Sequence, residues 1–347
     1  MFRFARFSAA TRALLVPSLV ILLGVGVAAL TGCSKKGAPG ATAASGVPES
    51  ELFDRLPATT FAFLFQETHS PAYREYAQSG FYQPSDAYLA KVRELSKDTP
   101  ELQRLSRILE ASPLLKDAAG KIQPPRELML FASASDGQSG SPEFGAYSIL
   151  AEDIDPAAHL SALEAAMKTE QLTVERRSFG AAHGLVLSDV AGSSTQSKKF
   201  FLVASTNRLS VSTSALLAER LVTPLDTIAP SERGRAALDA NPVFQRARAR
   251  AANTAGIFAF GFVDAASGLK LVQAAVPVGQ APIDTTQFDK SIESLAFART
   301  MGAGLNDFVW FGLPMGAVTP QVETILTGGG AHPGPVSYTH LTLPTKA

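Results

Sequence analysis

The sequence predicts an α+β fold, in which antiparallel sheet carries helices packed on one side. Three observations predict it. Short apolar runs rich in β-branched and aromatic residues recur between Gly, Asn, Asp and Ser, which is typical of strands. Tight turns such as Asn207-Arg208 join neighbouring runs, and tight turns connect antiparallel strands. Several runs lead directly into a helix start, so strands and helices share one region, either as one domain or as two diverged halves.

The predicted strands are short and are bounded by turn residues. Two of them, 59–65 and 307–313, are apolar at successive positions, which is typical of a strand covered on both faces. A further hairpin turn is expected around Gly180 to Gly184. The predicted strands are 59–65, 127–135, 144–151, 200–206, 208–214, 256–263 and 307–313.

A helix is predicted to begin after residue 155. Asp155 is a suitable N-cap, and Pro156 suits the first helical position. Leu160, Leu163 and Met167 then fall on one face at helical spacing, so this face is expected to pack on the sheet.

The same helix start recurs along the chain. Asn241 and Pro242 open another predicted helix, and Asp264 caps one that follows a strand. The strand–helix units are too unequally spaced for a solenoid. A diverged duplication of such a unit remains the alternative to an unrepeated domain.

The N-terminus has the pattern of a secretory signal. Arg3, Arg6 and Arg12 form a short positive segment without acids, and residues 13–30 carry no charge. A positive segment followed by an apolar one is typical of a leader that is removed on export.

The alternative is a transmembrane helix, because about 18 apolar residues come near the length that spans a bilayer. Pro17, Gly24 and Gly26 weaken a permanent helix in this segment. Export with removal of the leader is therefore the favoured prediction.

Leu30-Thr31-Gly32-Cys33 resembles the lipobox of bacterial lipoproteins, and Cys33 is the only cysteine of the chain. The resemblance implies cleavage after residue 32, acylation of Cys33 as the lipid anchor, and attachment to the membrane through it. Two or three acyl chains would anchor the protein firmly, at roughly 0.8 kcal/mol for each buried methylene. The alternative is a free cysteine in an uncleaved anchor.

Ser34 follows the lipobox cysteine, which resembles the sorting signal for the outer membrane in enteric-type bacteria. The resemblance implies a lipid-anchored protein of the bacterial cell envelope, at the periplasmic face or the surface of the outer membrane.

The remaining chain divides by composition. Residues 33–50 are small, polar and rich in Gly, Ala and Pro, which predicts a disordered tether. Residues 51–330 form the predicted folded region. Residues 331–347 are predicted to be a non-native tail, because 335–347, "PVSYTHLTLPTKA", departs from the preceding composition; a genuine C-terminal strand is the alternative.

The charge balance excludes a nucleic-acid footprint. Without the three arginines of the leader, the chain has 28 basic and 31 acidic residues. Nucleic-acid binding needs an excess of basic residues on one face of the protein. The densest basic cluster is Arg246, Arg248 and Arg250, of which the first and last share a helix face. A solvated helix face is favoured over a contact with anionic lipid.

The histidines have no metal-ligand spacing. His69, His159, His183 and His332 form no H-x-x-x-H or H-E-x-x-H motif, and no thiolate accompanies them. His159 lies one turn into a capped helix, where a solvated or hydrogen-bonded histidine is expected. Neither a metal nor another cofactor is predicted.

Signals for catalysis are weak. Ser267 and Lys270 have the S-x-x-K spacing of penicillin-recognising enzymes, but the S-D-N and K-T-G motifs of those enzymes are missing. Glu152, Asp153 and Asp155 could suggest acid–base chemistry or a cation site, but helix capping and the positive end of the helix dipole explain them better. No catalytic residue is therefore predicted.

Four aromatic residues are the candidates for ligand binding. Phe61, Phe63, Phe308 and Trp310 lie in the two strands that are apolar at successive positions. A sheet buried under helices is the simpler explanation. A groove for a lipid or another apolar ligand is the alternative.

A longer stretch resembles the domain-of-unknown-function 3352 proteins of the bacterial envelope. The resemblance rests on residues 200–222, 237–249 and 256–267, where a strand hairpin, an "NP-x-F" helix and a strand ending in Val-Asp follow one another. It covers about 55–315 and implies an extracytoplasmic α+β fold without a known active site.

Taken with the predicted anchor, these patterns lead to three functional expectations. The first is a non-catalytic binding or structural module of the cell envelope, with an envelope protein as its partner. A carrier of a lipid or other apolar ligand is the alternative, and a hydrolase is the third.

Overall fold

The computed structural model describes a large part of the predicted folded region, in several ranges. The predicted signal peptide, Cys33 and the predicted tail lie outside the described residues. The described ranges are 46–79, 125–134, 142–151, 153–188, 199–224, 237–268, 293–302 and 304–312.

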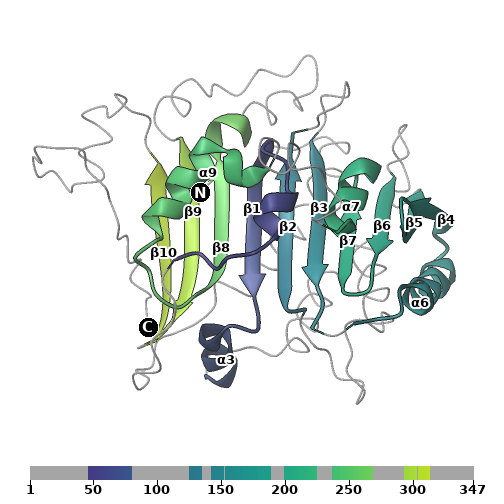
Figure 1. Cartoon of the computed structure of the whole chain (residues 1–347), viewed down its shortest axis with the longest axis horizontal. Helices are drawn as coiled ribbons and strands as arrows, with labels where there is room; N and C mark the ends of the chain where they lie inside the picture. Colours follow the sequence, from purple (N-terminus) through teal and green to yellow (C-terminus); the bar gives the residue numbers. More distant parts are fainter. Residues whose placement is uncertain are drawn as a thin grey trace, which may run out of the picture. The chain divides into compact units, whose positions relative to one another are not determined.

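Ten strands form one antiparallel sheet, in the order β10-β9-β8-β1-β2-β3-β7-β6-β5-β4 (Figure 1). Every strand predicted from the sequence is present. The strands are β1 Thr60–Glu67, β2 Glu127–Ser133, β3 Glu143–Ile149, β4 Thr173–Phe179, β5 Ala182–Ser188, β6 Phe200–Ala204, β7 Arg208–Ser212, β8 Ile257–Asp264, β9 Ser294–Met301 and β10 Leu305–Gly312.

The chain divides into two compact units, and β2 contributes residues to both. The α6/α7 unit contains β3 to β7 with two helices, α6 Pro156–Thr169 and α7 Ala215–Val222. The α9 unit contains β1 and β8 to β10. Its helices are α2 Leu52–Arg55, α3 Pro71–Gln78, the 3-10 helix η3 Leu238–Ala240 and α9 Pro242–Arg250.

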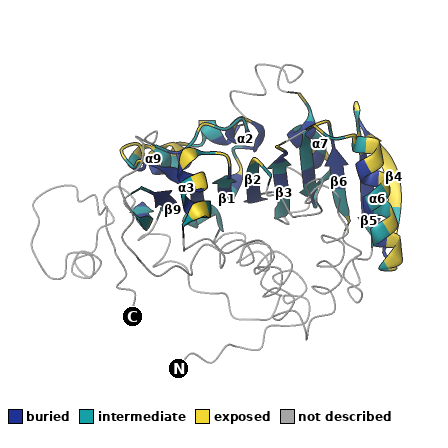
Figure 2. Cartoon of the chain, turned by 90° about the horizontal axis from the view of Figure 1, so that it is seen from below, coloured by how far each residue is buried: buried dark blue, intermediate teal, exposed yellow. Residues whose placement is uncertain are grey.

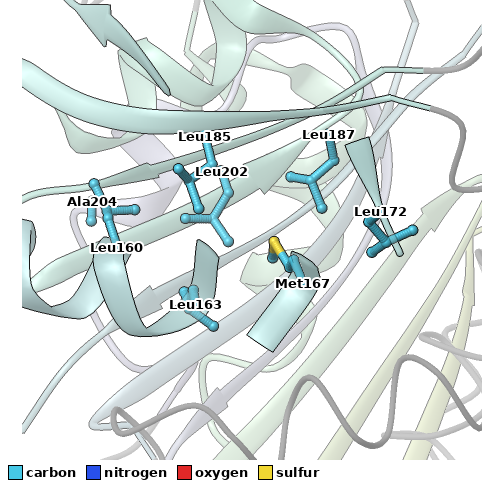
Figure 3. Close-up of a cluster of buried hydrophobic side chains, with 8 residues drawn as sticks. All are labelled: Leu160, Leu163, Met167, Leu172, Leu185, Leu187, Leu202 and Ala204. Carbon is cyan, nitrogen blue, oxygen red and sulfur yellow. The ribbon is translucent and has the colours of Figure 1, made fainter. Parts of the chain in front are cut away.

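In the α6/α7 unit, β4 to β7 form an antiparallel meander that returns to β3. The expected hairpin turn joins β4 to β5, where Gly180 has a φ of +55°. Helix α6 packs its apolar face on β5 and β6 as predicted (Figure 3). The buried cluster consists of Leu160, Leu163, Met167, Leu172, Leu185, Leu187, Leu202 and Ala204.

The two helices of this unit lie on opposite faces of the sheet, so the prediction of helices on one side is wrong here. The hydroxyl of Ser210 donates to the carbonyl oxygen of Ala218 in α7, at 2.7 Å. Its neighbours Leu209 and Val211 point the other way and join the α6 cluster. Strands β5 and β6 are apolar at successive residues, so both of their faces need a covering helix.

In the α9 unit, α2 and α9 lie on one face of the strands (Figure 2). Phe53 of α2 and Phe244 of α9 are almost fully buried, and their ring centroids are 5.3 Å apart. Both rings contact Phe63 of β1, with centroids 5.6 and 5.5 Å away. Phenylalanines of β8 complete this aromatic core, namely Phe260 and Phe262.

Strand β9 was not expected from the sequence, and its composition explains why. The face it presents to α9 carries the small residues Ala296 and Ala298, which have low strand propensity. Helix α9 contacts β8, β9 and β10 (Figure 1). Its residue Ala247 is fully buried. Small side chains on both elements let the helix lie close to the sheet.

Strands β1 and β8 resemble each other in sequence and pair symmetrically. They read TFAFLFQE and IFAFGFVD. Phe63 pairs with Phe262 and Phe65 with Phe260, on either side of the central pair Leu64 and Gly261. In the sheet order β1 and β8 are neighbours, and β9 and β10 follow beyond β8.

The predicted helix starts are confirmed. Asp155 accepts a hydrogen bond from the Ala157 amide at 2.9 Å, and Asn241 accepts from the amides of Val243 and Phe244. Each cap satisfies a free amide of the first helical turn.

No helix among the described residues combines the length and apolar character that a membrane span requires.

Candidate functional site: a groove between α9 and β10

A groove of about 520 Å³ lies within the α9 unit, where the C-terminal end of α9 passes over the edge strand β10. Its volume falls in the range of small-molecule sites, about 300–1,000 Å³. The lining residues come from α9, the α9–β8 connection, the end of β9, and β10. They are Arg250, Asn253, Thr254, Ala255, Thr300, Met301, Gly302, Asn306, Phe308 and Trp310.

Two aromatic rings form the apolar part of the groove. Phe308 and Trp310 alternate on β10 and point to the same face, with stacked rings 5.8 Å apart and 15° from parallel. Their cross-strand partners on β9 are Ala298 and Ala296. Both alanines are buried under α9, and neither is among the described residues that line the groove.

Arg250 is the charged residue of the groove. Helix α9 carries three arginines, and Arg246 pairs with Glu293 while Arg248 pairs with Asp239 at 2.9 Å. Within the described part of the chain, the guanidinium of Arg250 has no carboxylate partner. Among the described residues, the lining of the groove therefore contains one cation and no acidic side chain.

Gly312 at the end of β10 makes room for Arg250. A Cβ at this position would lie 2.9 Å from Nη1 of Arg250 and would overlap the hydroxyl oxygen of Ser294. The absence of a side chain thus allows the guanidinium to extend over the edge strand.

The remaining lining is polar at the rim. Asn306 donates to the carbonyl oxygen of Gly304 at 3.1 Å. The Thr254 carbonyl accepts from the amide of Gly46 at 2.9 Å, and Val47 is buried. The chain from the N-terminus therefore joins the fold at the groove rim, before the residue where the folded region is predicted to begin.

The structure separates the four aromatic candidates that the sequence predicts. Phe63 and Trp310 lie in one row across the sheet face, but β8 and β9 stand between them, which places them about 14 Å apart. Phe63 belongs to the aromatic core under α2 and α9. Phe61 is half-buried and near Gly268. Only Phe308 and Trp310 line the groove.

Sequence reasoning missed Arg250 as a groove residue, because it assigned the arginines of α9 to a solvated helix face. Arg246 is about half exposed and fits that assignment. Arg250 differs from the other two arginines in being the last residue of α9. This position becomes informative only when the structure shows that β10 lies beside it.

The histidines of the described chain do not converge. His69 and His183 are exposed and His159 is buried, while His332 lies outside the described residues. Across the described ranges, no three residues of the types His, Cys, Asp and Glu come close enough to hold a metal ion.

His159 differs from its expected state, since it is neither solvated nor fully hydrogen-bonded. Its side chain is buried on α6, and its Nε2 atom has no hydrogen-bond partner in the described part of the structure. Burial disfavours the charged imidazolium and lowers the pKa of His159 to about 4.

This burial predicts a loss of stability in acid. Between pH 6.5 and 4 the unfolded chain protonates His159 and the folded chain does not, so the free energy of unfolding falls as the pH falls. We expect His159 to contribute about 3 kcal/mol of this fall at most. Urea unfolding followed by circular dichroism at pH 7 and pH 4 measures the fall in the free energy of unfolding. An equal fall in His159→Gln would contradict the assignment.

The other chemical candidates have structural roles or cannot be placed. The hydroxyl of Ser267 donates to Asp264 at 2.9 Å, and its amide donates to the same carboxylate at 3.0 Å. This pairing caps the helix after β8, as expected for Asp264. Lys270 and Glu152 lie outside the described residues, and Asp153 is exposed.

No family model, no curated protein and no solved structure matches this chain. The resemblances to bacterial lipoproteins and to the domain-of-unknown-function 3352 proteins therefore stay predictions from the sequence.

Proposed function

We propose that the chain is an exported protein of the bacterial cell envelope, anchored to a membrane through acylated Cys33, whose folded part is a non-catalytic binding module. The order of leader, lipobox and tether supports the anchor. The groove between α9 and β10 supports the binding role, because it combines stacked aromatic rings with a cation that has no carboxylate partner among the described residues. Ser34 supports the outer membrane as the site of attachment.

The groove also supports the narrower alternative of a carrier for an apolar ligand. Phe308 offers a half-buried apolar ring, which stacks on the buried Trp310. A polar rim is typical of sites that fix a ligand's orientation. A carrier and a static binding module share this site and differ in whether the ligand is released elsewhere.

The position of the groove fits a ligand that comes from the membrane. Thirteen positions separate Cys33 from Gly46, which contacts the groove rim. Fully extended, this chain spans at most about 45 Å. The rim would then stay within that distance of the bilayer surface.

The proposed groove can be tested through Trp310, the only tryptophan of the chain. We expect the neutral apolar probe N-phenyl-1-naphthylamine to bind with one saturable site and to quench Trp310 by energy transfer. The measurement uses the Cys33→Ser chain that begins at residue 33, which carries every described residue and no acyl group. Phe308→Ala should weaken binding about tenfold, because an aromatic anchor is lost.

Leu216→Ala is the matched control, since Leu216 is 74% exposed and lies in the α6/α7 unit. This variant should bind the probe as the parent does. Unchanged binding in Phe308→Ala, or no quenching of Trp310, would exclude the groove as the site.

We also infer that the α9 unit arose by duplication of a helix–strand element. The inference is supported by the matching sequences of β1 and β8 and by their symmetric pairing about Leu64 and Gly261. The helices before the two strands each supply one buried phenylalanine, Phe53 and Phe244.

A further inference from the structure

We propose that the groove binds an anionic amphiphile, a molecule with one apolar chain and one negatively charged head group, and that Arg250 binds the head group. This inference rests on the proposed function, because it names the ligand class of the same groove.

The charges around the groove favour an anion. Arg246 and Arg248 are neutralised by acidic partners, whereas Arg250 lines the groove without a carboxylate among the described residues. The acidic residue of β10, Asp307, points to the opposite face and accepts two hydrogen bonds from Arg299, at 2.7 and 2.9 Å. Among the described residues that line the groove, the one formal charge is therefore positive.

The chemistry of Arg250 suits a carboxylate or phosphate head group. A guanidinium presents parallel N–H donors that bind such groups in a bidentate manner. Arg250 is partly buried, and Gly312 lets it extend over the edge strand. A charge-assisted hydrogen bond is stronger in such a partly desolvated position than in open water.

The apolar surface next to Arg250 suits a hydrocarbon chain. Phe308 presents a half-buried ring that stacks on the buried Trp310. The exposed Ala255 adds aliphatic surface beside the mostly buried Met301. Polar residues at the rim, such as Asn306, keep the opening compatible with water. A ligand that is charged at one end and apolar at the other matches both parts.

A series of three amphiphiles with the same chain tests the inference. Laurate is anionic, dodecyl maltoside is neutral and dodecyltrimethylammonium is cationic, and each is titrated below its critical micelle concentration. The protein is again the Cys33→Ser chain from residue 33, and Trp310 fluorescence is the readout. We expect laurate to bind most tightly and the cation most weakly, with laurate affinity falling at high salt.

Arg250→Gln should weaken laurate binding about tenfold or more and change dodecyl maltoside binding less than twofold. Arg250→Lys should keep most of the preference for laurate, which separates loss of charge from misfolding. Arg246→Gln is the matched control one turn earlier on α9, and it should leave laurate binding unchanged because Arg246 pairs with Glu293 outside the groove.

Two outcomes overturn the inference and remain distinguishable. Equal affinities across the three amphiphiles, unaffected by Arg250→Gln but weakened by Phe308→Ala, would reject the anionic head group while the groove stands. If none of the three amphiphiles binds and the neutral naphthylamine probe does not bind either, the proposed groove itself would be rejected.

Discussion

Phe63→Ala is expected to lower the free energy of unfolding by about 3–5 kcal/mol, the range for removing a buried phenylalanine ring. The ring is 3% exposed and contacts four other phenylalanines. One lies on α2, one on α9 and two on β8. The cavity would form at the centre of the α9 unit, where surrounding rings cannot collapse into it. Urea unfolding followed by Trp310 fluorescence measures the loss.

Phe260→Ala is the natural comparison, because Phe260 occupies the equivalent position in β8 and is fully buried. The inferred duplication predicts a loss of similar size. Leu216→Ala, on the exposed surface, should change stability by less than about 0.5 kcal/mol. A loss below about 1 kcal/mol in Phe63→Ala would show that this ring is not part of a packed core.

Cys33→Ser in the full chain is expected to abolish the lipid anchor completely. The thiol is the group that the lipobox resemblance assigns to acylation, and the chain has no second cysteine to replace it. We expect no incorporation of labelled palmitate and accumulation of the larger, uncleaved precursor. Metabolic labelling followed by gel electrophoresis measures both effects.

Ser34→Ala is the matched control for this experiment, since it changes the neighbouring residue and leaves the acylated thiol in place. It should be labelled and processed as the parent is. Normal labelling of Cys33→Ser would refute the anchor, and the functional proposal would then lose its link to the membrane.

Helix starts and most strands could be predicted because their causes are local. Asp155 followed by Pro156 satisfies the first amides of a helix whatever lies beyond it, and the structure confirms that helix. The strand β9 could not be predicted in the same way. Its alanines and the buried Arg299 are explained by α9 above it and by Asp307 beside it, and both are tertiary neighbours.

The candidate site was predictable only in part. Phe308 and Trp310 stand out as aromatic residues in an apolar strand, but Phe63 stands out equally and belongs to the core. Strand order separates them, because β8 and β9 lie between β1 and β10. Arg250 gains its role from β10, which follows it by more than fifty residues in the sequence.

Native mass spectrometry of the acylated protein, extracted from its own membrane, tests the central claim most directly. We expect a discrete extra mass on the folded chain that is lost on denaturation, while the covalent acyl groups remain. The extra mass should correspond to an anionic amphiphile and should be less abundant on the Phe308→Ala protein. Identical masses for the folded and denatured protein, together with no quenching of Trp310 by the naphthylamine probe, would contradict the account.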